Sequence, residues 1–314
     1  MLVDILLATY NGSRYLESQL DSIISQTHQS FRILVSDDGS SDATMAILES
    51  YREQLKDRLI LVKNASPGKG VIRNFENLMH FSLEDGQSNW MAFCDQDDVW
   101  LPQKIERMLA EMTRIEGCDG KSVPCLVHSD LEVVDENLGI IAPSFAKHQL
   151  INPDACSPLS LLSVNQVTGC AMMVNRTLLK MALPLPSEVI MHDWWCGLIS
   201  GSGRRFFIAT PLVLYRQHGG NQVGAKSRSL MNRLNRLFSD VPGIYRKIKK
   251  LGKDTLLQAQ ALQHRLLLFN FDCAYIDDYL SWRNKPWFVR VFRHRIYYSG
   301  PELDRLSRCL VWSR

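Results

Sequence analysis

The stretch NWMAFCDQDDVW, residues 89–100, joins an apolar run to three carboxylates within four positions. Trp90 to Phe93 is apolar throughout, as expected of a strand that is buried on both faces. Three carboxylates at Asp95, Asp97 and Asp98 repel one another and raise one another's pKa, so they cost free energy unless a cation or hydrogen-bond donors compensate them. The stretch therefore predicts a buried strand that ends beside a positive partner.

The order of apolar strand, polar turn and helix occurs four times in the first 115 residues. The predicted strands are Val3–Ala8, Phe31–Val35, Arg58–Asn64 and Asn89–Asp95, and the predicted helices are Arg14–Ser25, Ala43–Leu55, Val71–Ser82 and Leu101–Ile115, the last with Pro102 near its start. Such alternation, with strands that are apolar throughout, predicts a parallel sheet covered on both faces. We expect a doubly wound α/β fold whose ligands bind beyond the carboxyl ends of the strands.

Polar residues follow each predicted strand and are expected to converge on that rim. They are Thr9, Tyr10 and Asn11, then Asp37 and Asp38, then Gly68 to Arg73, and finally Asp95, Asp97 and Asp98. Neither a G-x-G-x-x-G fingerprint nor a Walker A loop follows the first strand, which excludes dinucleotide oxidoreductases and P-loop proteins. The aromatic ring of Tyr10 is suited to stacking on a nucleobase, although taken alone a solvent-facing turn explains it better.

Each of these groups has a chemical interpretation and a plainer alternative. Asp95 and Asp97 flank one residue and can point into the same space, where carboxylate oxygens suit Mg²⁺ or Mn²⁺. Asp98 precedes a predicted helix and fits a favourable charge at the helix start better than it fits a metal ligand. Asp38 is able to accept a hydrogen bond from the N3–H of uracil or thymine, or merely to cap the next helix. Arg73 is suited to phosphates, or is an ordinary surface arginine.

The second part of the chain changes pattern after Gly117. We predict short mixed strands in residues 125–135, 167–175 and 205–221, followed by helices Leu230–Phe238, Ile244–Lys250 and Thr255–Phe271. The predicted domains are residues 1–224, which bind the ligand and carry the chemistry, and a helical, basic region, residues 225–314.

Composition limits the class of protein. The 314 residues are 46% hydrophobic and 22% charged, enough for a sizeable core, and the net charge of +3 hides an uneven distribution. From Lys226 onward there are about 18 Lys and Arg against about 7 Asp and Glu. Eight cysteines without a C-x-x-C pair indicate neither a zinc site nor a disulfide framework, so reduced thiols and a cytoplasmic location are expected. The sequence shows no signal peptide and no apolar run of membrane-spanning length.

Several motifs in order resemble those of one enzyme family. LLATYNGSRYLESQLDSIISQTHQSFRILVSDDGSSDAT, residues 6–44, followed by FCDQDDVWLPQKI, residues 93–105, resembles the family 2 inverting glycosyltransferases of the GT-A fold. The later motifs VTGCAMMVN, MHDWW and YRQHGGN resemble the bacterial rhamnosyltransferase-like members that build O-antigen and other surface polysaccharides. The resemblance covers about the first 220 residues.

The resemblance implies a role for each matching position. Thr9, Tyr10 and Asn11 with Asp38 would hold the base of a dTDP or UDP sugar, and Arg73 and Asp95 would contact its nucleoside or diphosphate. Asp97 would ligate a divalent metal, Mg²⁺ or Mn²⁺, together with Asp95 and His218. Asp193 would be the catalytic base, and Gly169, Cys170, His192 and Trp194 would shape the sugar and acceptor pocket. Many members have Glu-Asp where this chain has His192-Asp193, so His192 could share or contest the role of base.

The implied activity is inverting transfer of a sugar, L-rhamnose from dTDP-L-rhamnose, to a glycan or lipid-linked acceptor, with a UDP-hexose donor as the alternative. Two other classes of protein are alternatives to a glycosyltransferase. A nucleotidyltransferase would show a Gly-rich basic loop after the first strand, and a non-catalytic binding or scaffold protein would not turn over its ligand.

The basic tail favours a location on the inner face of the cytoplasmic membrane. Aromatic residues at 282, 287, 288, 292, 297 and 298 alternate there with Arg283, Lys285, Arg290, Arg293 and Arg295. This composition suits anionic headgroups. A basic helical domain with buried tryptophans is the alternative, and no recognition motif supports a nucleic-acid partner.

Overall fold

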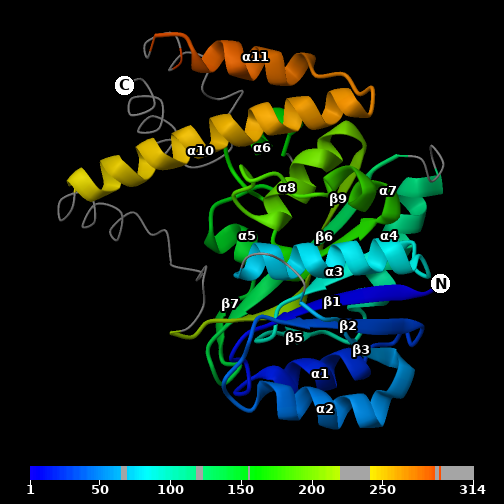
Figure 1. Ribbon diagram of the computed structural model, residues 1–314. Helices are drawn as coiled ribbons and strands as arrows, with labels where there is room; N and C mark the ends of the chain where they lie inside the picture. Colours follow the sequence, from blue (N-terminus) through cyan, green and yellow to red (C-terminus); the bar gives the residue numbers. More distant parts are fainter. Residues whose placement is uncertain (65–68, 118–122, 155, 220–240, 287–289, 291–314) are drawn as a thin grey trace.

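The computed structural model describes residues 1–64, 69–117, 123–154, 156–219, 241–286 and 290. Its centre is one sheet with helices on both faces (Figure 1). The strands are β1 Val3–Thr9, β2 Phe31–Asp37, β3 Leu59–Leu61, β4 Trp90–Cys94, β5 Val99–Trp100, β6 Cys125–Val134, β7 Ile140–Ala142, β8 Met172–Asn175 and β9 Arg204–Arg216. The main helices are α1 Leu16–Ile24, α2 Thr44–Leu55, α3 Val71–Asp85, α4 Lys104–Gly117, α7 Arg176–Ala182, α8 His192–Ile199, α10 Val241–Leu268 and α11 Ala274–Arg283.

The sheet has two halves of different character. Its strand order is β3-β2-β1-β4-β8-β6-β9-β5, with β7 paired to β6. The strands from β3 to β4 are parallel, as predicted, whereas β8 runs antiparallel to both of its neighbours. The predicted α/β fold is therefore confirmed, and the parallel half puts the ends of β1, β2 and β4 on one rim.

Alternating side chains of the buried strands supply two cores. In β1, Ile5 and Leu7 pack with α1 and α4 on one face, while Leu6 packs with α3 and α8 on the other. A side-chain period of two makes a strand that is buried on both faces apolar at most positions. This explains why the four first strands could be located from the sequence.

Some predicted boundaries were wrong. The strands predicted in residues 125–135 and 205–221 are β6 and β9, which pair in parallel with irregular register near Asp130, although β9 ends five residues earlier than predicted. The two helices predicted at 244–250 and 255–271 are the single helix α10, in which Gly252 is tolerated because Thr255 Oγ1 and Arg283 both donate to its carbonyl. The predicted helix at 230–238 and the domain boundary at 224/225 lie outside the described residues.

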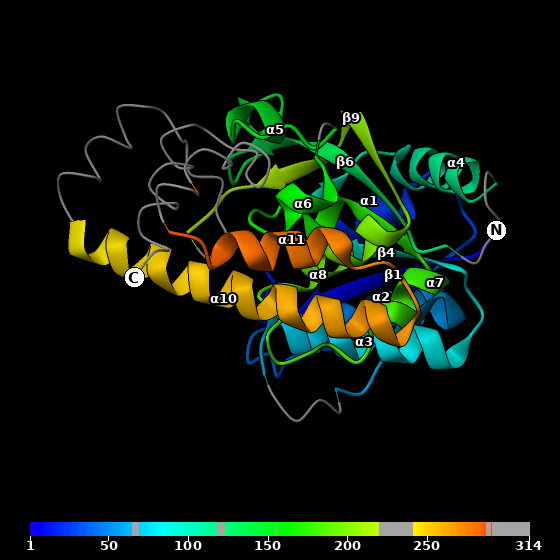
Figure 2. The same cartoon turned by 90° about the horizontal axis from the view of Figure 1, so that it is seen from above.

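The C-terminal helices cover the molecule rather than standing apart from it. Figure 2 shows α10 and α11 side by side over the face that carries α3 and α8. Leu262 and Leu266 of α10 and Ile276 and Tyr279 of α11 are buried in the same core as the α3 side of the sheet. In the described part of the chain, no helix is long and apolar enough to cross a membrane.

This packing corrects part of the prediction that the tail contacts a membrane, because some of the residues expected there are buried. Trp282 is only 4% exposed and belongs to the core, and Arg290 is buried as well. Arg283 donates to the Gly252 carbonyl at 2.7 Å, so it links α11 to α10. Lys285 is exposed. The remaining predicted contacts, Trp287, Phe288, Phe292, Arg293, Arg295, Tyr297 and Tyr298, lie outside the described residues.

Candidate active site

The acidic loop, residues 95–98, connects β4 to β5 at the rim of the sheet. Asp95 and Asp97 are partly exposed, whereas Asp98 is fully buried and its Oδ1 accepts a hydrogen bond from the Arg216 amide at 3.1 Å. The prediction that Asp98 marks a helix start was wrong, because Val99 and Trp100 form β5 and α4 begins only at Lys104. A short antiparallel pairing of β5 with β9 turns Asp98 inward.

Burial makes the charge on this loop costly. It is the main cause that raises the pKa of Asp95 to about 7, and the carboxylates of Asp97 and Asp193 add to the effect. Burial likewise raises the pKa of Asp98 well above its usual value. An ionised carboxyl in such a place needs compensation. Basic residues, hydrogen-bond donors or a cation beside the loop would supply that compensation, in line with the prediction from the sequence.

Two basic residues that the sequence reasoning missed lie beside the loop. Lys104 is fully buried: its Nζ lies 3.2 Å from the centre of the Trp100 ring and donates to the Cys170 carbonyl at 2.6 Å. Burial lowers the pKa of Lys104 to about 8, while the nearby acids oppose that effect. Arg216 is nearly buried and donates from Nε to the Asp97 carbonyl at 2.8 Å. The sequence could have pointed to them only by position: Lys104 closely follows the motif CDQDDVW, and Arg216 lies within YRQHGGN.

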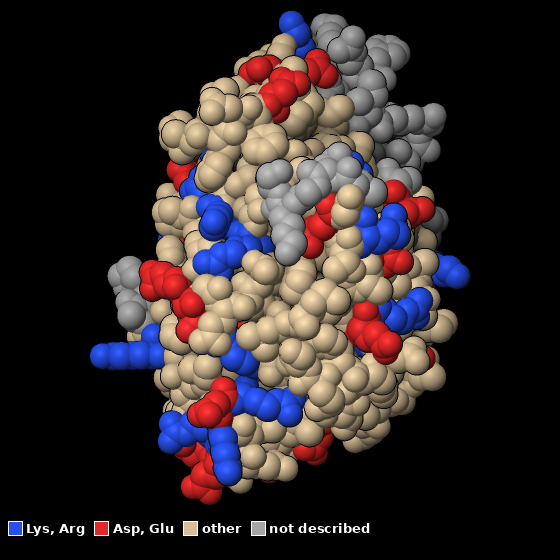
Figure 3. Space-filling view, turned by 90° about the vertical axis from the view of Figure 1, so that its right-hand side faces the viewer, with Lys and Arg blue, Asp and Glu red and all other residues tan. Residues whose placement is uncertain are grey.

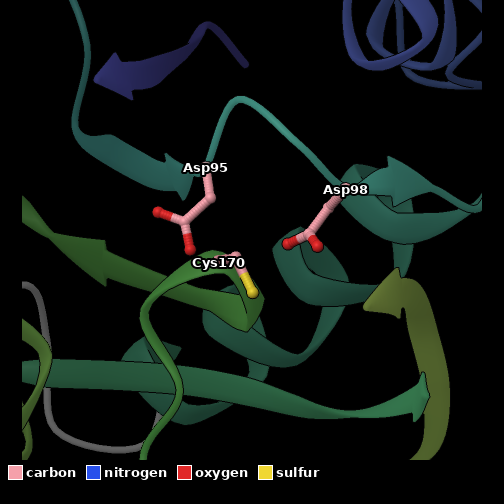
Figure 4. Close-up of side chains that lie close together, drawn as sticks. All are labelled: Asp95, Asp98 and Cys170. Atoms are coloured by element: carbon pink, nitrogen blue, oxygen red, sulfur yellow. The ribbon is translucent and has the colours of Figure 1, made fainter. Parts of the chain in front are cut away.

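The residues predicted to bind a metal fall into two groups. His218 Nε2 lies 2.9 Å from Asp97 Oδ2, and the His218 ring packs on Tyr15 with centroids 4.8 Å apart. Asp95 converges instead on Asp98 and Cys170, whose candidate ligand atoms all lie within 4.8 Å of one another (Figure 4). Carboxylate oxygens fit Mg²⁺ or Mn²⁺, but a thiol does not. Asp95 and Asp97 therefore fit a hard divalent cation by their chemistry, and Cys170 does not.

The turn after β1 is tied to the acidic loop. Gln96 spans the two, since its Oε1 accepts from the Tyr10 amide at 2.8 Å and its Nε2 donates to the Tyr10 carbonyl at 3.0 Å. The Tyr10 side chain is 54% exposed, so its ring is accessible at the rim. Asn11 adopts φ 47°, in the left-handed region, and its Oδ1 accepts from the Ser41 amide at 2.8 Å. Gln96 was not singled out from the sequence.

The loop after β2 contains one aspartate that builds the turn and one that faces the next loop. Asp37 accepts hydrogen bonds from Thr9 Oγ1 at 2.8 Å and from the amides of Gly39 and Ser40. Asp38 Oδ2 accepts from the Gly70 amide at 2.6 Å, so Asp38 holds the loop that precedes α3. The structure therefore brings Thr9, Asp38 and Gly70 together at the ends of β1 and β2.

Arg73 lies in the first turn of α3, and its guanidinium pairs with Glu76. Glu76 also accepts a hydrogen bond from the Leu185 amide at 2.8 Å. Gly70, at φ 106°, lets the chain enter the helix in a conformation that side chains rarely adopt. Gly68 lies outside the described residues.

Asp193 is held at the start of α8 by three donors. Its Oδ1 accepts from the Trp194 amide at 2.6 Å and from Asn165 Nδ2 at 3.1 Å, and its Oδ2 accepts from the Gly169 amide at 3.1 Å. Burial raises the pKa of Asp193 to about 6, although these hydrogen bonds oppose that effect. Such a pKa suits a general base near neutral pH. Asn165 was not expected from the sequence.

His192 is a core residue. Its ring stacks against both Phe75 and Phe93, with centroids 4.1 Å and 5.5 Å away, and it is 3% exposed. Burial lowers the pKa of His192 to about 3, so the imidazole is neutral and weakly basic. Asp193 is therefore the stronger base of the two. Both His192 ring nitrogens lack a hydrogen-bond partner within the described residues.

The expected packing of Trp194 against a sugar is also corrected. Trp194 is 5% exposed and its Nε1 donates to the Leu161 carbonyl at 2.6 Å, which places the ring in the core. Cys170 is fully buried below the acidic loop. Gly169 lies against α8: a Cβ at this position would come within 3.0 Å of His192 Nε2. Of the predicted pocket residues, Gly169 and Trp194 contact the Asp193 carboxylate, each through its backbone amide.

A parallel half-sheet with an acidic loop at its rim and a buried carboxylate beside it agrees with the GT-A fold that the sequence led us to expect. The family model described as "Glycosyl transferase family 2" matches residues 4–149. That segment is similar to the family 2 glycosyltransferases, and together with relatives that are named glycosyltransferases it identifies the chain as a glycosyltransferase. The match includes the loops that carry Asp38 and Asp95 but ends before Asp193.

Individual proteins agree with this assignment. The dTDP-rhamnosyl transferase RfbG of Shigella flexneri is 26% identical over 230 residues, which are 70% of this chain and 74% of that protein. An uncharacterized glycosyltransferase of Nostoc sp., alr2836, is 27% identical over 233 residues, 70% of this chain and 66% of that protein. The crystal structure of S. aureus TarS 1-349 in complex with UDP-GlcNAc superposes with a TM-score of 0.54 at 16% identity, covering 98% of this chain and 90% of that one. The last similarity concerns the fold alone.

Proposed function

We propose that this enzyme transfers a sugar with inversion from a nucleoside-diphosphate donor, dTDP-L-rhamnose, to a glycan or lipid-linked acceptor of a cell-surface polysaccharide. The similarity to the dTDP-rhamnosyl transferase of S. flexneri supports the donor. The observation that carries the proposal is the Asp193 carboxylate, which is poised as a base by burial and by three hydrogen-bond donors. A UDP-hexose donor is the alternative, since Asp38 would accept the same N3–H from uracil and thymine.

The chain's own residues have distinct tasks in this proposal. Tyr10 and Asp38 hold the base, and Arg73 contacts the nucleoside diphosphate. Asp193 takes the proton from the acceptor hydroxyl as that oxygen attacks the anomeric carbon, and the bond to the diphosphate breaks on the opposite face. One displacement from the opposite face inverts the anomeric centre and needs no covalent intermediate.

A divalent cation is part of the proposal. Asp95 and Asp97 would hold it with His218, and when bound it would offset the negative charge that grows on the departing diphosphate. The pairing of His218 with Asp97 at 2.9 Å supports their joint role.

A donor screen tests the proposal. Release of nucleoside diphosphate is measured with dTDP-rhamnose, UDP-glucose, UDP-galactose and UDP-N-acetylhexosamines, each with Mg²⁺ or Mn²⁺ and with lipid-linked glycan acceptors. We expect turnover to be highest with dTDP-rhamnose and to stop when the cation is chelated. If only UDP-glucose were turned over, the proposed donor would be wrong and UDP-glucose would take its place. Release of pyrophosphate would indicate a nucleotidyltransferase instead.

The role of Asp193 is tested by Asp193→Asn. Loss of a general base should lower kcat about 10²- to 10⁴-fold while donor affinity stays within a few-fold of the parent. Asp272→Asn is the control, because Asp272 also accepts a hydrogen bond near a helix start, from the Ala274 amide at 2.9 Å, but it precedes α11. Near-normal turnover of Asp193→Asn would reject the assignment.

A further inference from the structure

Lys104 is a buried cation that the proposed chemistry does not use. Its side chain is fully buried at the first residue of α4, directly behind the acidic loop. A buried ammonium is strongly unfavourable unless its surroundings compensate it, and an apolar residue of the same length would fill the space at lower cost. Its charge acts on both Asp95 and Asp98. This placement indicates a task other than filling the core.

The contacts of Lys104 lead from the acidic loop to Asp193. Nζ donates to the Cys170 carbonyl at 2.6 Å, which fixes the middle of the turn Gly169–Ala171. The amide at the start of that turn, Gly169 N, donates to Asp193 Oδ2 at 3.1 Å. The turn is also in close contact with α8, since a Cβ on Gly169 would meet Asp193 Cβ at 3.5 Å. Movement of the Cys170 carbonyl would therefore displace the donor that orients Asp193.

We propose that Lys104 is a positioning residue for sugar transfer: by holding the Cys170 carbonyl, it keeps the Gly169 amide on the Asp193 carboxylate. This inference rests on the proposed role of Asp193 as the base. Because Lys104 is fully buried, we expect it to act through Gly169 and not on the substrate itself. Its ammonium links the start of α4, which follows the acidic loop, to the turn Gly169–Ala171, which contacts the Asp193 carboxylate.

Lys104→Met tests the inference, since methionine fills the same space without the donor or the charge. Release of dTDP from dTDP-L-rhamnose with Mg²⁺ is followed, with water as the acceptor, and affinity for dTDP is measured separately. A displaced base should lower kcat about 10- to 100-fold, while the Kd of dTDP stays within about threefold.

The pH profile separates positioning from a structural role. Asp193 is faced by the Gly169 and Trp194 amides and Asn165, by the Asp95 carboxyl and by the Cys196 thiol, which burial keeps neutral. The Gly169 hydrogen bond lowers the pKa of Asp193. Weakening that bond in Lys104→Met should therefore raise the pH below which kcat/KM declines, which is the acid limb of the pH profile. Lys104→Arg keeps a cationic donor and should restore both kcat and the acid limb at least partly.

Arg265→Met is the matched control. Arg265 is also a nearly buried cation that donates to backbone carbonyls, those of Met181 and Leu183 at 2.8 and 2.7 Å, but it lies on α10. Its loss should lower thermal stability without moving the acid limb. If Lys104→Met does not fold, Lys104→Gln is measured instead, because it retains an N–H donor without the charge and should keep the acid limb in place.

Two results would overturn the inference. The first is a folded Lys104→Met variant whose kcat stays within about twofold of the parent and whose acid limb is unchanged. The second is a Lys104→Gln variant whose acid limb shifts to higher pH as far as we expect for Lys104→Met, although glutamine retains an N–H donor. If Asp193→Asn is active, the base assignment itself fails. If Asp193→Asn is inactive and Lys104→Met is normal, only the role of Lys104 fails.

Discussion

At Asp193, burial and hydrogen bonding act in opposite directions on one carboxyl. Burial raises its pKa, and the donors Gly169, Trp194 and Asn165 lower it, with about 6 as the outcome. An ordinary aspartate has a pKa of about 3.9 and is a weaker base. The balance yields a group that is mostly ionised at neutral pH yet basic enough to take a proton.

The activity should therefore fall in mild acid. Only the ionised Asp193 accepts a proton, so kcat/KM should be constant above its pKa and decline about tenfold per pH unit below about 6. The measurement is kcat/KM against pH with the divalent cation kept saturating, and the control is recovery of full activity after return to neutral pH. An acid limb more than about one pH unit lower would contradict a pKa of about 6 for Asp193.

Elements of the sheet are tied together by a buried ion pair. Asp4 of β1 and Arg32 of β2 are directly paired in the parallel register. Arg32 donates from Nε and Nη2 to Asp4 Oδ1 at 3.0 and 2.8 Å, and Ser82 Oγ of α3 donates to Asp4 Oδ2 at 2.7 Å. The aspartate that interrupts the first apolar run is thus matched by a residue of the next strand.

Breaking this pair should destabilise the fold. Arg32→Met leaves the Asp4 carboxylate buried without its main partner, which should lower the free energy of unfolding by about 3 to 5 kcal/mol. Urea unfolding followed by circular dichroism measures the change.

Arg52→Met is the control for Arg32→Met, since Arg52 pairs with Glu49 at 2.7 Å on the surface of α2. An exposed pair of this kind contributes about 1 kcal/mol or less. Equal effects of the two substitutions would show that burial does not decide the strength of the Asp4 pair.

On the scale of the whole molecule, charge is unevenly distributed along the chain, but at least one face of the molecule carries both signs. Figure 3 shows acidic and basic residues interspersed on the side where the N-terminus lies. Exposed basic residues gather in the first turns of α10, at Arg246, Lys247, Lys249 and Lys250. A lipid-linked acceptor would place the enzyme at an anionic surface, and we propose α10 as the part that contacts it.

Binding to anionic vesicles should follow. The protein should sediment with phosphatidylglycerol-containing vesicles at low salt and be released as NaCl is raised, because surface charges are screened. Lys247→Glu with Lys249→Glu should weaken binding severalfold. Lys56→Glu with Lys180→Glu makes the same change in net charge on exposed positions of other elements. Equal loss in both double variants would rule out a specific role of α10.

Local patterns made much of the fold predictable. The apolar strands and the loops that follow them are adjacent in sequence, so Asp38, Asp95 and Asp97 could be placed on one rim from the residues alone. The motif that contains His192 and Asp193 could be singled out too, but the sequence did not decide which of its side chains are buried. Whether an aromatic residue faces a ligand or the core depends on what packs against it, and for Trp194 and Trp282 that is a distant part of the chain.

The sequence by itself determined the order of strand and helix, the rim and the carboxylates on it, because each follows from residues within one strand and its adjoining loop. Only the tertiary structure decided which groups compensate that charge. Asp98 is buried because β5 pairs with β9, and Lys104 reaches Cys170, 66 residues away. Such contacts depend on the spatial order of strands, and hydrophobic periodicity along a chain carries no information about it.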